Sequence, residues 1–123
     1  MSLPPSVRPH FDLLLCTPLV DPVPLRQEVA AFAASIHEAV DRDELDLDMG
    51  RVDAVAQALE AMLKRVSRKT TPLHHRLIVA TALFFIEGPD RGRPLDDARF
   101  RDDVAVLNET ARVIRRPELS IRT

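Results

Sequence analysis

The sequence predicts an all-α protein, a single domain resembling a four-helix bundle that is preceded by a proline-rich apolar arm. Apolar residues recur at steps of three and four in four successive segments after residue 24, as amphipathic helices require. Aspartate, threonine and proline stand where these segments begin, and glycine or proline where several of them end. A chain of 123 residues, 46% hydrophobic and 29% charged, fits one globular domain. We therefore divide the chain into an arm, residues 1–24, and a helical domain, residues 25–123.

The N-terminal arm contains six of the ten prolines, which excludes a long helix because proline lacks a backbone donor and pushes the preceding residue toward extended geometry. Its apolar residues are nevertheless too numerous for a solvated tail. We expect one short element that packs on the domain or on a neighbouring subunit. Phe11 and Leu14 are its candidate partner-binding residues.

The first helix of the domain is expected to follow Asp21, a plausible N-cap, with Pro22 and Pro24 in its first turn and an apolar stripe to Val40. An acidic linker that ends at Gly50 separates it from the second helix. That helix has the cleanest stripe of the chain and carries basic residues at its C-terminal end, where they complement the helix dipole.

The third helix is expected to begin with Thr71 as N-cap and Pro72 at N1, and to end at Gly88 and Pro89. Its apolar face is nearly continuous, so we expect this helix to be the central and most buried one. A charged connection follows. We expect the fourth helix to carry a stripe from Val104 to Ile114, to stop before Pro117, and to use Asp102 and Asp103 at its start as caps.

Charge is divided unevenly along the chain. Residues 1–63 carry 4 basic and 11 acidic side chains, whereas residues 64–123 carry 13 and 8. Such a division can steer one copy onto another or bring the basic half to an acidic partner. The single cysteine, Cys16, permits neither an internal disulfide nor a cysteine zinc site, and no apolar run is long enough for a membrane span, so we expect a cytoplasmic protein.

A divalent-metal-dependent hydrolase is an alternative, because such helical enzymes need carboxylates on facing helices. The candidate ligands are Glu38, Asp41, Asp90, Asp102 and Asp103. These acids lie near helix ends or turns, so solvated faces and caps are the simpler interpretation. An EF-hand is excluded because the glycine and glutamate positions of its loop are not matched. No phosphate-loop, dinucleotide or G-x-S-x-G motif is present, and we therefore predict no cofactor and no catalytic residue.

A second alternative is a nucleic-acid-associated protein that uses the basic segment at residues 64–76. The negative net charge and the absence of Tyr and Trp for stacking argue against it. His74 and His75 lie in the same segment, and His75 is placed to face an acid such as Asp53 or Glu87.

Residues 77–114, with Phe84 and Phe85 ending an apolar helix, then Asp90 and Pro94 in a turn, then paired aspartates at 102–103, resemble the YkvA-like family of small bacterial helical proteins of unknown function. The resemblance implies a helical hairpin around a charged turn and brings no catalytic activity with it. Here Arg91, Gly92 and Arg93 are inserted into that turn.

The charged connection after the third helix is the first choice for a partner-binding site, because long loops without regular structure are frequently functional. Its candidate residues are Arg91, Arg93, Asp96, Asp97 and Arg99. The leading functional hypothesis is a non-catalytic protein-interaction or adaptor module, forming a homodimer or binding another protein.

Overall fold

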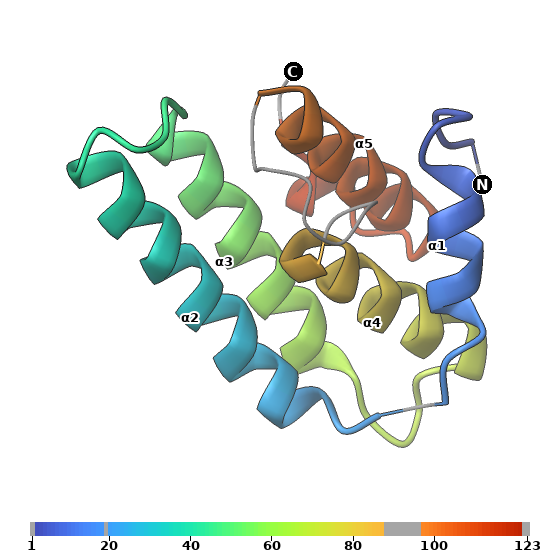
Figure 1. The fold of residues 1–123 in the computed structure, drawn as a ribbon. Coiled ribbons are helices and arrows are strands. Elements are labelled where there is room, and N and C mark those ends of the chain that lie inside the picture. Colours follow the sequence, from blue (N-terminus) through green and yellow to red (C-terminus); the bar gives the residue numbers. More distant parts are fainter. Residues whose placement is uncertain (1, 19, 88–96, 122–123) are drawn as a thin grey trace.

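The computed structural model describes residues 2–18, 20–87 and 97–121, and in these residues the chain forms five α-helices and no β-strand (Figure 1). The prediction of an all-α protein is confirmed. The elements are α1 (Arg8–Leu15), α2 (Pro22–Asp41), α3 (Met49–Arg65), α4 (Pro72–Glu87), α5 (Asp97–Val113) and a short 3-10 helix, η1 (Pro117–Leu119). No described helix combines the length and the apolar character that crossing a bilayer requires.

The helix starts follow the expected capping chemistry. The Asp21 side chain accepts a hydrogen bond from the Val23 amide at 2.9 Å, which confirms Asp21 as the N-cap of α2. The Thr71 hydroxyl oxygen accepts from the His74 amide at 3.3 Å at the start of α4. At α3 the cap is Asp48, which accepts from the Arg51 amide.

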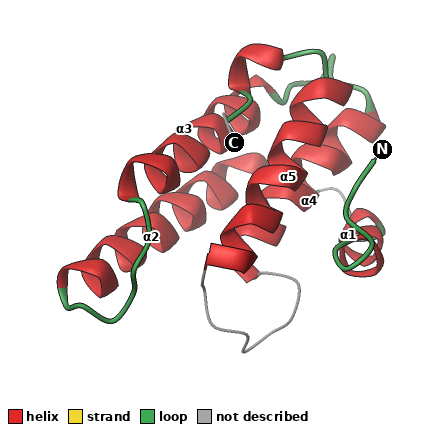
Figure 2. Ribbon diagram, turned by 90° about the horizontal axis from the view of Figure 1, so that it is seen from above, coloured by secondary structure: helices red, strands yellow, loops and turns green. Residues whose placement is uncertain are grey.

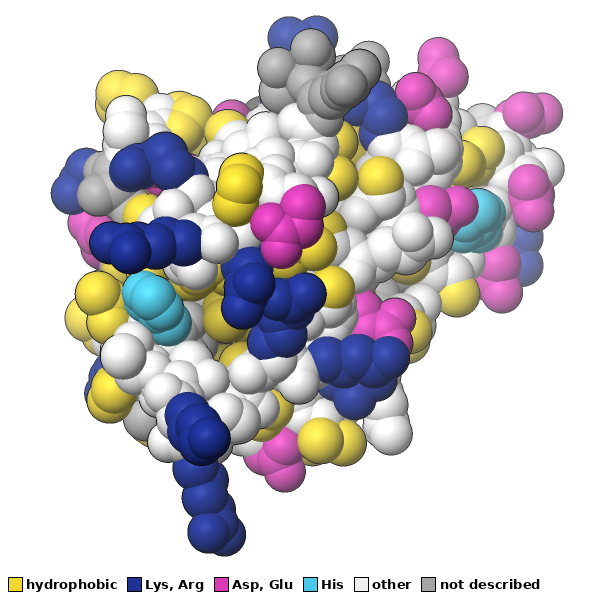
Figure 3. All heavy atoms as spheres, turned by 180° about the vertical axis from the view of Figure 1, so that it is seen from behind, with side chains coloured by type: hydrophobic (Ala, Val, Ile, Leu, Met, Phe, Trp, Pro, Cys, Tyr) yellow, Lys and Arg dark blue, Asp and Glu magenta, His cyan; other side chains and the backbone are white. Residues whose placement is uncertain are grey.

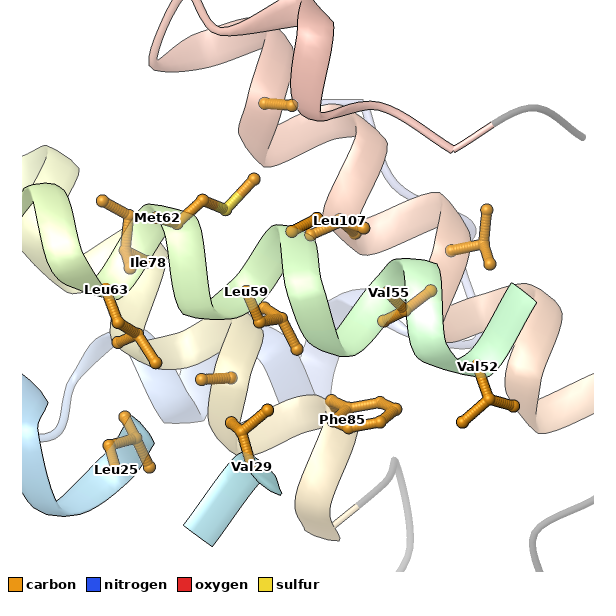
Figure 4. Packing of buried hydrophobic residues seen from close by; sticks show 14 of the residues in the cluster. Leu25, Val29, Val52, Val55, Leu59, Met62, Leu63, Ile78, Phe85 and Leu107 are labelled. Carbon is orange, nitrogen blue, oxygen red and sulfur yellow. The ribbon is translucent and has the colours of Figure 1, made fainter. Parts of the chain in front are cut away.

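Helix α4 is the centre of the fold and contacts each of the other four α-helices. Eight of its residues are buried, which confirms the prediction made from its continuous apolar face. Helices α2 and α3 lie side by side as an antiparallel pair against α4 (Figure 1). Between α3 and its neighbours lies the main core, where Val55, Leu59 and Met62 meet side chains from α2, α4 and α5 (Figure 4).

Helix α1 packs on the other side of α4, away from the α2–α3 pair (Figure 2). Phe11 and Leu14 are buried in a second apolar cluster with Phe84 of α4 and Val106 of α5. The connection after α1 is held by α4, because Arg76 donates to the carbonyl oxygens of Leu15 and Thr17, each at 3.3 Å. Residues 2–18 are thus part of the folded structure.

Helix α5 begins at Asp97, about two turns earlier than the sequence stripe indicated. Phe100 is buried and belongs to the same face as Val104 and Leu107, so the apolar period starts at Phe100. The expectation that Asp102 and Asp103 cap this helix is therefore wrong: both lie inside it. Asp103 is only 2% exposed.

Candidate functional site

The carboxylates proposed as metal ligands are not brought together. Glu38 and Asp41 are exposed in the last turn of α2, whereas Asp102 and Asp103 lie on α5. Within residues 2–18, 20–87 and 97–121 there is no group of three or more His, Cys, Asp or Glu side chains that could hold a metal ion. Asp90 lies outside the described residues.

The residues predicted to bind a partner are placed differently from one another. Arg91, Arg93 and Asp96 lie outside the described residues, and Asp97 is the first residue of α5. Phe11 and Leu14 are directed into the protein's own second cluster, where they serve the docking of α1.

Arg99 is also directed inward and is 6% exposed. Its Nη2 donates to the carbonyl oxygens of Phe85 and Ile86, each at 3.3 Å, and its guanidinium lies 5.8 Å from the ring centre of Phe32. The last carbonyls of a helix have no partner inside the helix, so Arg99 supplies donors that α4 needs at its C-terminal end. Arg99 therefore links α5 to the C-terminal end of α4 in the protein interior.

His37 and His75 each lie close to a polar partner in the fold. His37 Nε2 lies 2.8 Å from Asp53 Oδ1, linking α2 to α3. His75 Nε2 lies 2.9 Å from the carbonyl oxygen of Val20 and thus contacts the connection before α2. Asp53, one of the two acids suggested for His75, lies instead against His37, because α2 packs on α3.

Cationic side chains meet around a cavity of about 190 Å³ where the end of α3, the start of α4 and the chain after α5 come together. We call this cavity the basic pocket. Its wall consists of Met62, Arg65, Lys69, Thr70, Thr71, His74, Ile78, Ile114 and Arg116, so the described residues that line it include three permanent cations and no carboxylate.

Local hydrogen bonds fix the turn that carries Lys69. The Thr70 Oγ1 atom accepts from the Ser67 amide at 3.0 Å, and the Lys69 amide donates to Ser67 Oγ at 3.2 Å. The Thr70 amide closes the same turn on the Ser67 carbonyl. Arg65, in the last turn of α3, precedes this turn directly.

Arg116 is positioned by the way α5 ends. Arg115 adopts a left-handed backbone with φ of 61°, the Arg116 amide donates to Ala111 O at 2.8 Å, and the Arg115 amide donates to Arg112 O. This is a Schellman motif, which normally places glycine at the left-handed position. Asn108 then exchanges two hydrogen bonds with the backbone of Ile121, which holds the following segment along α5.

None of the three pocket cations forms an ion pair among the described residues. Nearby, Lys64 lies 3.9 Å from Glu60, and Arg112 binds Glu109. The hydrogen bond from Arg112, together with one from the Ser2 amide, lowers the pKa of Glu109 to about 2. Within the described chain, Arg65, Lys69 and Arg116 thus have no acidic partner.

The acidic and basic segments of the sequence also lie apart in the folded protein. The connection from α2 to α3 carries exposed acids at positions 41, 43, 44, 46 and 48, and we call residues 41–48 the acidic end. The basic end comprises residues 64–76 and 112–116. The two lie at opposite ends of α3, whose 17 residues span about 25 Å. In Figure 3 most visible Asp and Glu side chains lie toward the right, and most Lys and Arg side chains toward the left.

Part of the basic pocket could be predicted from the sequence. The segment 64–76 stood out as a basic cluster, although as a candidate for nucleic acid. The contribution of Arg116 was missed, and the available signal was the run Arg112, Arg115 and Arg116 before Pro117.

Comparisons with known proteins add no assignment to this geometry: no protein-family model, curated protein or solved structure matches the chain. The resemblance of residues 77–114 to the YkvA-like family therefore stays a prediction.

Proposed function

We propose that the protein is a non-catalytic interaction module that binds an acidic segment of a partner protein through its basic end. The observation that carries this proposal is the basic pocket, in which Arg65, Lys69 and Arg116 converge without a carboxylate among the described residues of its wall. Cations that line one cavity create a positive potential there, and a bound anion is stabilised by it.

Apolar side chains in the pocket wall favour a protein partner. Ile114, which follows α5, is part of this wall and is half-buried. The interior of the pocket is also partly apolar, since Met62 and Ile78 are buried in its floor. Protein interfaces combine such apolar contacts with a polar rim, whereas duplex nucleic acid presents mainly phosphates.

In this proposal the carboxylates considered as metal ligands have no catalytic role. The acids of the acidic end act only by orienting an approaching partner. The acidic end repels an acidic partner and directs it toward the basic end. A second copy of the chain, presenting its own acidic end, is a possible partner of this chemistry, and a homo-oligomer is then a head-to-tail assembly.

Fluorescence anisotropy with a labelled oligoglutamate peptide tests the proposed function. We expect salt-sensitive binding, because exposed charges are screened by added ions. The double variant Arg65→Gln/Arg116→Gln is expected to bind about tenfold or more weakly, since charge-assisted hydrogen bonds contribute about 1.5–3 kcal/mol each.

Arg68→Gln is the matched control, because Arg68 is exposed in the same connection but does not line the pocket. It removes one charge and should leave the affinity within about twofold, as expected for an exposed, unpaired position. A duplex DNA of equal charge that binds more tightly than the peptide would overturn the proposal in favour of nucleic acid. Light scattering at low and high salt shows whether the acidic partner is a second copy of the chain.

A further inference from the structure

We infer that the basic pocket recognises a phosphate monoester, carried either by a phosphorylated side chain of the partner or by a small molecule. This inference rests on the proposed function, because it names the chemical group that the same surface binds. Charge, donor arrangement and room in the pocket each favour a phosphate ester over a single carboxylate.

The positive charge of the pocket wall favours a ligand with two negative charges over a ligand with one. The wall of the pocket carries Arg65, Lys69 and Arg116, and the described residues of the wall include no acid. The C-terminal ends of α3 and α5 each contribute about −0.5 and the N-terminal end of α4 about +0.5, so the local charge stays above about +2. A carboxylate neutralises one of these charges, whereas a phosphate monoester carries about −1.5 to −2 at neutral pH.

The donors come from three separate segments and surround the cavity. Arg65 enters from the end of α3, Lys69 from the turn after it, and Arg116 from the chain after α5. A phosphate has three terminal oxygens, each able to accept from a different cation, and guanidinium groups match two of these oxygens at once. A planar carboxylate has two oxygens in one plane, so it meets donors from three separate directions less evenly than a tetrahedral phosphate does.

Side chains at the start of α4 line the remaining side of the pocket. The Thr71 oxygen accepts from the His74 amide at 3.3 Å, and its hydroxyl hydrogen remains available to donate. His74 lines the pocket one turn into the helix. Both residues stand at the positive end of α4, where anions are stabilised.

The size and floor of the pocket suit an ester rather than a bare ion. A volume of about 190 Å³ corresponds to about six water molecules, so a phosphoryl group leaves space for the carbon atoms attached to it. That space adjoins Met62, Ile78 and Ile114, which are apolar and offer contact to the ester substituent.

Isothermal titration calorimetry with three peptides of one sequence tests the inference, the central residue being phosphoserine, serine or glutamate. We expect the phosphopeptide to bind at least about tenfold more tightly than the glutamate peptide, because it makes more charge-assisted hydrogen bonds. Arg65→Gln and Arg116→Gln should each remove this preference, whereas Arg68→Gln should retain it. Phenyl phosphate and inorganic phosphate are titrated in parallel.

The outcomes separate this inference from the proposed function. Phosphopeptide binding that exceeds the binding of phenyl phosphate supports a phosphorylated partner side chain, and equal affinities support a small phosphate ester. Equal binding of the phosphoserine and glutamate peptides refutes the phosphate inference while leaving the interaction module intact. If none of these probes nor oligoglutamate binds, both proposals fail. A preference that survives Arg65→Gln and Arg116→Gln refutes the assignment to this pocket.

Discussion

Asp103 is a buried carboxyl group on α5. It is 2% exposed, and within the described chain neither of its oxygens has a hydrogen-bond partner. Desolvation raises the pKa of Asp103 well above its ordinary value, the charge of Arg99 opposes this rise, and the neighbouring Asp102 adds to it. The folded protein therefore binds the Asp103 proton more tightly than the unfolded chain does.

This difference makes stability depend on pH in a defined direction. Because the folded-state pKa is raised, the contribution of Asp103 is fully present below the unfolded pKa of 3.8 and is lost as the pH rises through the raised pKa. Asp103→Asn cannot ionise and should flatten this decline in urea denaturation measured from pH 4 upward. A decline of unchanged slope in Asp103→Asn contradicts the assignment.

Asp103→Leu removes the buried polar atoms as well as the titration. We expect it to raise the free energy of unfolding at pH 7 by about 1–3 kcal/mol, the usual cost of an unsatisfied buried polar group. A loss of stability in this variant means that the carboxylate has a partner that stabilises it.

At the scale of elements, the packing of α1 on α4 can be tested by a single substitution. Phe11 is fully buried, and its ring lies 6.4 Å from that of Phe84 between centroids. Phe11→Ala should lower the free energy of unfolding by about 3–5 kcal/mol, as large-to-small core substitutions do. Leu13→Ala is the control, since Leu13 lies on the same helix and is 70% exposed.

Limited proteolysis distinguishes two ways in which Phe11→Ala can act. If α1 detaches by itself, cleavage within residues 2–18 should increase while the melting temperature of the remainder changes little. If α1 is integral to the core, both should change together. A variant as stable as the wild-type protein contradicts the packing of α1 on α4.

Elements whose ends are marked by local chemistry could be predicted from the sequence. Asp21 before Pro22 and Thr71 before Pro72 fixed two helix starts, because capping depends on neighbouring residues alone. The start of α5 was missed because a polar stretch separates Phe100 from the preceding helix and the apolar period was counted from Val104. A helix that starts near Val104 would have Asp103 as a cap, whereas Asp103 lies inside α5.

The candidate site depends on contacts that no local pattern contains. Arg65 and Arg116 are far apart in the sequence, and they line one pocket only because α3, α4 and α5 pack together. The segment 64–76 could be recognised as basic, but the sequence does not show which of its side chains form ion pairs. That separation required Glu60 and Glu109 to be placed in space.

At the scale of the whole molecule, charge is organised along α3, with the acidic end at one terminus of the helix and the basic end at the other. The proposed acidic partner is thus attracted to one end and repelled by the other, which orients it before contact. This arrangement makes the proposed binding of an anion at the basic end compatible with a net charge of −2.

Chemical-shift mapping of the ¹⁵N-labelled protein with the acidic peptide tests this claim most directly, because it reports the site of binding residue by residue. We predict that the largest shifts occur at amides of residues 65–74 and 114–116, and that they disappear in Arg65→Gln/Arg116→Gln but not in Arg68→Gln. Shifts concentrated on α1, or on the acidic end at residues 41–48, would contradict the account.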